Sequence, residues 1–431
     1  MRKLLTPILL GAFIILGLGV RWSYASEISL LLQKLVEKGV LTAGEAQQIG
    51  TETKEQIKKE ISQAKYDILP EWLQKTKFKG DFRLRYQLKE DKGVTNDHAL
   101  RIRLRAGFET KINEQMKAGF GIATGSTSDP RSTNVTLADS GTSNATPTAS
   151  FKSIILDYAY GQYSPTSWLT FTGGKFKNPI WQPNNLLWDG DLNPEGANIQ
   201  LDYRLNPYAG LFFNAEAFIL NYKKTSSTVK NSNAMMWVVQ PGVKYNLHDW
   251  LDLKTAVAGY FTTKIKGKPT FSGRTTNTTT ASSTYKYNYS SVNPSLEISM
   301  KEPFKTIPIL GQYVPYFGVF SDFVYNPSPA TGKSGFDYGF KFGSEKVADW
   351  GQWQARVNYG KLGRDAFLDI FPDSDRYSGK TNMQSWEANL EYGLAKNSTL
   401  NLNYHWGESL SASGDSHLPQ QLVLIDWILK W

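Results

Sequence analysis

Five arginines recur at every second position in two neighbouring segments of the sequence, residues 78–88 and 99–110. These arginines are Arg83, Arg85, Arg101, Arg103 and Arg105. Alternate side chains of a β-strand point to the same face, so two adjacent strands would place the guanidiniums together on one wall. Like charges repel one another unless water, anions or acids lie opposite. The inside of a water-filled channel would supply that setting.

Two interpretations of this basic wall remain open from the residues alone. The arginines could form a functional basic ladder that selects anions or sets a transverse field across a channel. They could instead be structural partners of acids that face the same lumen, such as Asp81 and Glu109.

A second charged group lies in the segment 178–196, which is rich in proline and large apolar residues. Two other long polar tracts, at 125–151 and 265–284, are rich in Ser, Thr and Gly instead. If the segment 178–196 packs inside a barrel, its acids face the arginine wall across a narrowed pore. These acids are Asp189, Asp191 and Glu195. A Ca²⁺ loop and packing on the surface are the alternatives, although the spacing of an EF-hand is absent.

Catalytic and cofactor chemistry has little support in the sequence. The chain has no cysteine, which excludes a disulfide scaffold, a thiol nucleophile and a Cys-based metal site. Of its four histidines only His405 is expected to face the lumen, beside Asn401 and Asn403. No phosphate loop, zinc motif or nucleic-acid patch is present, so we expect no enzyme, no cofactor and no nucleic-acid partner. The tract 373–375 could ligate Ca²⁺, but a solvated turn is the simpler interpretation.

Period-2 alternation of apolar and polar residues runs from Phe78 to the C-terminus and indicates about sixteen strands. They are expected near 78–88, 99–110, 115–124, 152–163, 168–177, 196–205, 210–222, 235–246, 250–264, 285–301, 314–326, 335–346, 351–361, 384–395, 398–407 and 420–431. Pro241 is expected to force a bulge in the eighth strand, and Pro294 interrupts the tenth.

The links between these strands alternate short and long, which is typical of an outer-membrane barrel with short periplasmic turns and long outer loops. In three short links a Trp begins the next strand, at positions 168, 250 and 350. Such rings suit the boundary between outer-membrane lipid and water. The last strand alternates apolar residues through Trp427, Leu429 and Trp431. It resembles the signal that the barrel-assembly machinery recognises, and it should pair antiparallel with residues 78–88.

The N-terminal region differs from the barrel. Residues 1–25 have the basic start, apolar run and small residues of a signal peptide. Their removal takes away three basic residues and no acid, so the net charge falls from +9 to +6. Residues 26–77 are expected to form a helical periplasmic leader and linker, with helices near 27–38 and 43–65, and residues 78–431 form the barrel. Thr42 and Glu45 make a capping box for the second helix.

The chain resembles the putative porin family of Gram-negative bacterial outer membranes. The residues that carry the resemblance are 31–42 with Glu45 and Ala46, 78–86, 191–196 and the C-terminal strand. The resemblance implies homotrimers, and an inward third loop whose acids at 189, 191 and 195 oppose the basic ladder.

The sequence therefore predicts an all-β protein: a transmembrane antiparallel up-and-down β-barrel of about sixteen strands, preceded by a short helical periplasmic region. We expect a porin in the bacterial outer membrane for passive diffusion of small hydrophilic solutes or ions, with anion preference as one option. The alternative is a structural anchor that residues 26–66 tether to the cell wall or to partners.

Overall fold

The computed structural model describes residues 31–68, 71–91, 96–138, 151–222, 233–271, 276–411 and 419–431. The expected signal peptide, residues 1–25, lies outside these ranges. The chain forms two compact units, Met1–Lys75 and Thr76–Trp431. Among the described helices, none combines the length and the hydropathy that are needed to cross a bilayer.

The first unit is helical where it is described. Residues 31–37 form a helix, α3 spans Ala43–Ile68 and α4 spans Glu71–Gln74. Gly39 follows the first helix at a φ of 70°, a conformation that glycine takes without strain. The Glu45 carboxylate accepts the Thr42 backbone N–H at 2.8 Å, and the Thr42 hydroxyl accepts the Glu45 N–H at 3.3 Å. The predicted second helix and its capping box are confirmed. Residues 27–30 of the first expected helix are not among the described residues.

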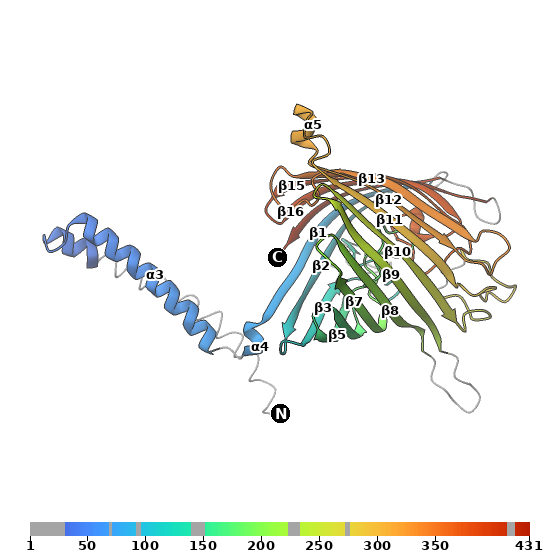
Figure 1. Ribbon diagram of the computed structural model, residues 1–431, viewed down its shortest axis with the longest axis horizontal. Coiled ribbons are helices and arrows are strands. Elements are labelled where there is room, and N and C mark those ends of the chain that lie inside the picture. Colours follow the sequence, from blue (N-terminus) through green and yellow to red (C-terminus); the bar gives the residue numbers. More distant parts are fainter. Residues whose placement is uncertain are drawn as a thin grey trace, which may run out of the picture. The chain divides into compact units, whose positions relative to one another are not determined.

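The second unit is one antiparallel sheet that closes on itself (Figure 1). Within the described residues, sixteen strands of seven or more residues form the sheet, together with the two-residue β4 (Val135–Thr136). The long strands are β1 (Thr76–Asp91), β2 (Asp97–Lys111), β3 (Met116–Thr124), β5 (Ile154–Thr166), β6 (Leu169–Lys175), β7 (Glu195–Arg204), β8 (Ala209–Asn221), β9 (Ala234–His248), β10 (Leu251–Thr263), β11 (Ser291–Lys301), β12 (Tyr316–Tyr325), β13 (Ser334–Gly343), β14 (Trp353–Leu362), β15 (Met383–Ala395), β16 (Ser398–Ser409) and β17 (Gln420–Lys430). The predicted barrel is confirmed.

The barrel closes where β1 meets β17. The two strands pair antiparallel, from Asp81 opposite Lys430 to Asp91 opposite Gln420, as expected. Beyond β17, Trp431 and Gly80 exchange two backbone hydrogen bonds of 3.1 Å each. A Cβ at Gly80 would lie only 2.5 Å from the Trp431 ring. The absence of a side chain at Gly80 therefore leaves room for this ring against the seam.

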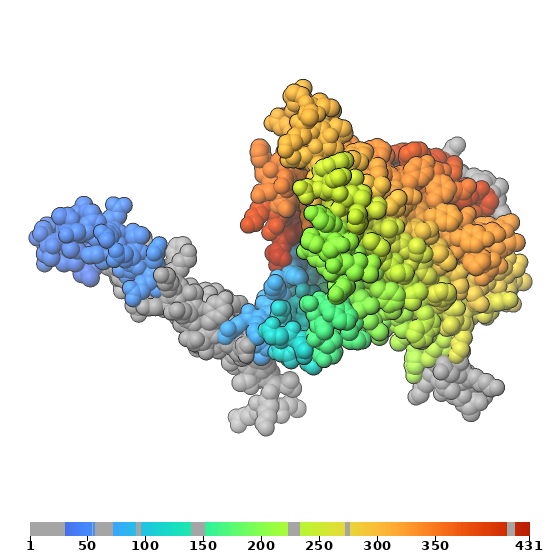
Figure 2. All heavy atoms as spheres, viewed as in Figure 1, coloured from blue at the N-terminus to red at the C-terminus, as the bar shows by residue number. Residues whose placement is uncertain are grey.

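The strands turn an apolar face outward and a polar face into the barrel. On β17 the side chains of Ile425 and Trp427 are 42% and 41% exposed, whereas Asp426 between them is 2% exposed. On the face drawn in Figure 2, outward side chains of neighbouring strands pack into a continuous wall. This alternation follows from the period of two residues in a strand, and a lipid environment requires an apolar outer band.

Short and long links alternate around the sheet. The short-link end includes one longer connection, residues 302–315, which carries α5 (Pro308–Tyr313). At the opposite end, the third loop (residues 176–194) and the seventh loop (residues 363–382) enter the barrel. Their apolar side chains join inward residues of the wall in one core inside the barrel. That core includes Leu186, Leu187, Trp188, Phe367, Leu368 and Phe371.

Two local expectations are wrong. Pro241 causes no bulge, because it stands in register opposite Phe213 on β8, and the β9–β10 register is the same on both sides of it. A proline in a strand lacks the N–H for one ladder bond, and here the pairing tolerates that loss. β11 begins at Ser291 rather than at 285. The preceding residues belong to a loop whose Tyr289 hydroxyl donates to Asp365 of the seventh loop at 3.1 Å.

Candidate pore constriction

The register of β1 and β2 assembles the five arginines on one wall of the lumen. Arg83 stands opposite Arg103, and Arg85 stands opposite Arg101. The fifth, Arg105, stands opposite Asp81. The side chains of Arg83, Arg85 and Arg103 are 11%, 3% and 9% exposed. They therefore lie inside the barrel, as the alternation of residues in the sequence predicted.

Acids of the same wall pair with this arginine group. Asp81 bridges Arg103 and Arg105 at 2.8 and 2.7 Å. Asp426 of β17 accepts two hydrogen bonds from Arg85, at 2.7 and 2.8 Å. A bidentate contact of this kind is the strongest geometry open to a guanidinium and a carboxylate. Asp81 was one of the partners expected from the sequence, whereas Asp426 was not identified. Glu109, the other expected partner, instead binds Lys79 at 2.7 Å and Tyr160 at 2.7 Å.

The third loop crosses the lumen. At one end, the Trp181 backbone N–H donates to the Gln240 side chain on β9 at 2.8 Å, and the Gln240 amide donates to the Trp181 carbonyl at 2.7 Å. The Lys254 ammonium of β10 lies 4.4 Å from the centre of the Trp181 ring. At the other end, Asp191 lies against the arginine group. Since β9 and β10 lie about halfway around the sheet from β1 and β2, the loop spans the space between opposite walls.

Asp191 meets the arginines as the sequence suggested. Its carboxylate lies 3.2 Å from Arg105 and 3.6 Å from Arg103, and it accepts the Thr133 hydroxyl at 2.8 Å. Burial opposes ionisation of this carboxyl, but the nearby Arg103 and Arg105 lower its pKa below the usual range. Asp191 is therefore held as a carboxylate in front of a positive wall.

The other two acids of this segment do not lie opposite the arginines, so that expectation is wrong for both. Asp189 is buried and accepts the backbone N–H of Ser374 at 2.8 Å. Burial, together with the neighbouring Asp373 and Asp191, raises its pKa well above the usual value. Glu195 begins β7 and pairs with Lys175 at 3.2 Å, with its side chain 65% exposed. Glu195 is remote from the arginines because β7 is separated from β2 by β3, β5 and β6 in the sheet.

The seventh loop supplies an acid that sequence reasoning missed. Asp375 lies 2.9 Å from Arg85. Burial opposes its ionisation, but Arg85, His405 and Arg83 lower the pKa of Asp375 to about 2. The tract 373–375 was interpreted as a solvated turn or a weak Ca²⁺ motif. The available signal was the segment 366–371, which is apolar except for Asp369 and has the same character as the third loop.

The third and seventh loops hold each other in place. The rings of Trp188 and Phe371 are 4.1 Å apart, and the Asp189 backbone N–H donates to the Phe371 carbonyl at 2.8 Å. Arg376 of the seventh loop reaches the wall, at 3.0 Å from Asp337 and 3.2 Å from Glu387. The two loops therefore act as one inward body that is fastened to several strands.

The second long loop also contributes a buried cation. Arg131 is 2% exposed and donates to the carbonyls of Pro372 and Gly379 in the seventh loop, at 3.0 and 2.9 Å. Its remaining guanidinium nitrogens bind Asp129 at 3.1 and 3.2 Å. Arg101, at the outer end of the arginine group, donates to Gln87 at 3.1 Å and to the Asn134 carbonyl at 3.3 Å. No pattern in the sequence separates Arg131 from a surface arginine.

Within this network of direct ion pairs, guanidiniums outnumber carboxylates by one. Five guanidiniums face four carboxylates, those of Asp81, Asp191, Asp375 and Asp426. Both interpretations of the basic wall thus have a structural basis, because the arginines are paired and yet outnumber the carboxylates that bind them directly. Charges of both signs on facing surfaces set up a field across a lumen.

The remaining site residues lie elsewhere. Trp427 is on the outward face of β17, and its indole N–H donates to Ser398 at 3.2 Å. Leu429 occupies the same face, and Trp431 extends the seam. His405 is buried on the inner face of β16, opposite Glu387. Over the described ranges, no three His, Cys, Asp or Glu side chains form a group that could hold a metal ion.

Solved structures with a similar fold are outer-membrane proteins. OprB of Pseudomonas putida matches with a TM-score of 0.52 at 11% identity, over 84% of this chain and 96% of that chain. The outer membrane channel DcaP of Acinetobacter baumannii matches with a TM-score of 0.44 at 13% identity, over 83% and 97%. OmpF of Salmonella typhi matches with a TM-score of 0.46 at 10% identity, over 82% and 97%. At these identities the OprB match supports the fold alone.

A comparison with curated proteins finds no match. The model of the family described as "Putative porin" matches residues 90–325 and 325–416. These ranges cover most of the chain and include β2, the third loop and the seventh loop. The expected resemblance is thereby confirmed, and the chain belongs to this family of putative porins, with the closed sixteen-strand barrel of an outer-membrane channel.

Proposed function

We propose that the protein forms a water-filled channel for passive diffusion of small hydrophilic solutes and ions across the bacterial outer membrane, after export by its signal peptide. The constriction carries this proposal: guanidiniums of β1 and β2 face carboxylates of two inward loops inside a closed barrel. In a channel, charged groups of both signs order dipolar solutes and separate ions by sign.

A weak preference for anions is part of the proposal. The arginine group, which outnumbers its directly bound carboxylates by one, lies where Asp191 and Asp375 approach it from the inward loops. Anions are attracted to that site and cations are repelled, with an energy that screening by salt keeps small. We therefore expect a preference that weakens at high ionic strength.

Conductance in planar lipid bilayers tests the channel directly. Purified full-length protein is expected to give stable conductance steps and, in a tenfold KCl gradient, a reversal potential displaced toward the chloride equilibrium potential. A correctly folded protein that produces no steps would defeat the proposal. Swelling of protein-containing liposomes in small sugars provides a second measure of passage that does not depend on charge.

The homotrimer and the assembly signal are also proposed. The family resemblance supports trimers, and native mass spectrometry in detergent should give a mass of three chains. The outward residues Trp427 and Leu429 and the seam residue Trp431 support recognition by the barrel-assembly machinery. Their replacement by polar residues should slow barrel assembly in cells without altering export.

The leader supports a second function, a tether from the outer membrane to the cell wall or to partners through residues 26–66. The observation in its favour is that the helical region belongs to a compact unit of its own, which ends at Lys75. Deleting residues 26–66 should leave conductance intact. If the leader is a tether, the deletion should also weaken attachment of the envelope to the cell wall.

A further inference from the structure

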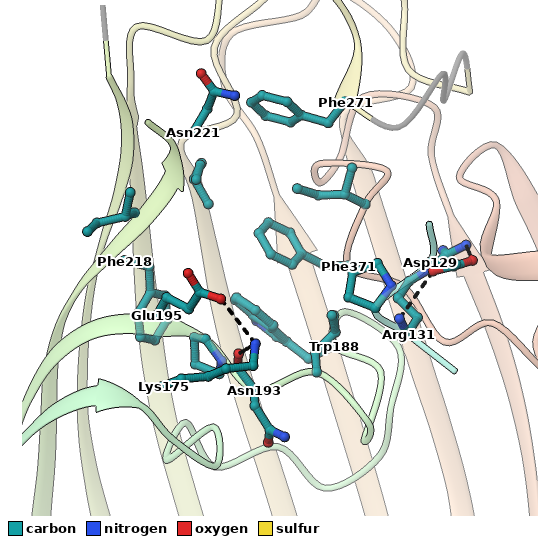
Figure 3. Close-up of a pocket in the computed structure, with 16 residues that line it drawn as sticks. Asp129, Arg131, Lys175, Trp188, Asn193, Glu195, Phe218, Asn221, Phe271 and Phe371 are labelled. Carbon is teal, nitrogen blue, oxygen red and sulfur yellow. Dashed lines mark hydrogen bonds and ion pairs between the residues drawn. The ribbon is translucent and has the colours of Figure 1, made fainter. Parts of the chain in front are cut away.

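The barrel holds a cavity of about 400 Å³ beside the third loop (Figure 3). Its lining comes from β6, β7 and β8 and from four of the long loops. Sites for small molecules are concave and mostly apolar, with volumes of roughly 300 to 1,000 Å³. The cavity is distinct from the contact between the arginine group and Asp191, because none of the five arginines lines it.

One side of the cavity is an apolar edge of the loop core. Leu192, Leu220, Phe271 and Ile370 line the cavity and are only partly buried, and they pack against the buried core. Behind them Trp188 and Phe218 are each 1% exposed, with ring centres 5.9 Å apart. The cavity is thus the place where the apolar core meets the lumen. Covering this edge with an apolar group removes surface from water, which favours binding.

The other side of the cavity carries a pair of opposite charges. The Lys175 ammonium lies 3.2 Å from the Glu195 carboxylate and donates to the Asn193 carbonyl at 3.0 Å. The Lys175 and Glu195 side chains are 25% and 65% exposed, so a solute can reach both. Figure 3 shows them together on one side of the cavity, away from Asp129 and Arg131. Arg131 is 2% exposed and its guanidinium is engaged by Asp129 and two carbonyls, so it is not offered to a solute.

We infer that this cavity is a binding subsite for a zwitterionic solute with an apolar side chain, namely a free apolar amino acid. The inference rests on the proposed channel function and names a solute class for it. The ammonium and carboxylate of an α-amino acid are joined by one carbon and match Glu195 and Lys175, which lie side by side. The apolar side chain then covers the edge formed by Leu192, Leu220, Phe271 and Ile370.

The energetics favour this exchange of partners. An ion pair as exposed as that of Lys175 and Glu195 contributes little by itself, about 0 to 1 kcal/mol. Opening it for a solute therefore costs little, and the solute forms two charge-assisted hydrogen bonds in return. A neutral sugar cannot supply both charges, and glycine cannot cover the apolar edge. The subsite should therefore discriminate by charge and by side chain together.

Titration calorimetry on the full-length protein in detergent tests the subsite, with phenylalanine as the probe. We expect saturable binding of phenylalanine. Three analogues each remove one recognised feature and should bind at least about tenfold more weakly: N-acetylphenylalanine, phenylalaninamide and glycine. Equal binding of all four compounds, or no binding of phenylalanine, would overturn the inference.

Protein variants locate the site. Glu195→Gln should weaken phenylalanine binding about tenfold, because the solute ammonium loses its charged partner. Asp202→Asn is the matched control: Asp202 also lies on β7, pairs with Lys244 at 2.7 Å and is 66% exposed, but it does not line the cavity. The control should bind like the wild type. Equal effects of the two substitutions would place binding elsewhere and refute the assignment.

Conductance separates this inference from the proposed function. In a bilayer, phenylalanine should reduce the current through wild-type channels in a concentration-dependent manner, and glycine should reduce it far less. If phenylalanine neither binds in calorimetry nor changes the conductance, the subsite is refuted, but the channel function is still supported by the conductance itself. Calorimetric binding by a protein without conductance refutes the channel and retains the subsite.

Discussion

Neutralising three members of the arginine group should reverse the ion preference of the channel. Replacement of Arg101, Arg103 and Arg105 by Gln changes the local balance from five positive and four negative charges to two positive and four negative. The variant also leaves Asp81 without its contacts to Arg103 and Arg105, and Asp191 without its nearest cation. Every part of this change makes the constriction more negative.

The size of the effect follows from Coulomb's law. An ion that passes about 7 Å from a unit charge interacts with it by about 0.6 kcal/mol in water. Screening at about 0.1 M salt halves this energy, so three charges contribute about 0.9 kcal/mol. Removing the three positive charges lowers the energy of a passing cation and raises that of a passing anion by this same amount. The ratio of cation to anion permeability should therefore rise about 20-fold.

The reversal potential in a tenfold KCl gradient measures this ratio. We expect the variant to move it by tens of millivolts toward the potassium equilibrium potential. Replacement of the same three residues by Lys keeps the charge and should leave the preference near that of the wild type. Heat-modifiable migration on gels confirms that each barrel has folded. An unchanged reversal potential in a folded Gln variant would show that the arginine group is outside the conducting path.

Three further predictions concern the inward loops. Asp375→Asn should weaken docking of the seventh loop by about 1 to 3 kcal/mol, because the buried Arg85 loses a charged partner, and amide exchange in residues 363–382 should accelerate; exchange equal to that of the wild type would contradict this. Burial and the neighbouring Asp375 and Glu387 raise the pKa of Asp373 to about 6, so protonation below that pH should strengthen docking. The pKa of Asp375 is lowered to about 2, so its ionised form stabilises docking of the seventh loop. This stabilisation is fully present above the unperturbed pKa near 3.9 and is lost as the pH falls through 2. Exchange in this loop, corrected for intrinsic rates, should thus be slowest at about pH 4 to 5, and a steady increase on acidification from pH 7 would refute the assignment. Gln240→Ala removes both backbone contacts of Trp181 and should increase current noise and exchange in residues 176–194. Gln200→Ala removes a hydrogen bond to Asn214 on the neighbouring β8, and not a bond to the backbone of Trp181, and should have a much smaller effect.

The strands and their facing directions were predictable because they follow from local periodicity. Alternation in residues 78–88 and 99–110 is sufficient to place Arg83 and Arg103 inside the barrel, since a strand offers only two faces. The antiparallel contact of 78–88 with 420–431 follows once the sheet must close. Pro241 was misjudged because a missing N–H can be absorbed without a change of register.

The loop part of the site was only partly predictable. Asp191 was found because the apolar character of its segment indicated inward packing. The same reasoning applies to residues 366–371 and would have predicted that the segment with Asp375 packs into the barrel. The partners of Arg131 and Asp426 could not be found, because they are contacts between segments far apart in sequence. Polarity reports whether a loop is buried, but not which of its carboxylates meets which cation.

The contact between Trp188 and Phe371 has a consequence for how the channel closes and opens. Two loops anchored on different walls share one apolar core, so one cannot leave the lumen without uncovering the other. Their movements are therefore cooperative. Single-channel records should contain one all-or-none transition of the constriction, and not two independent sublevels with separate dwell times.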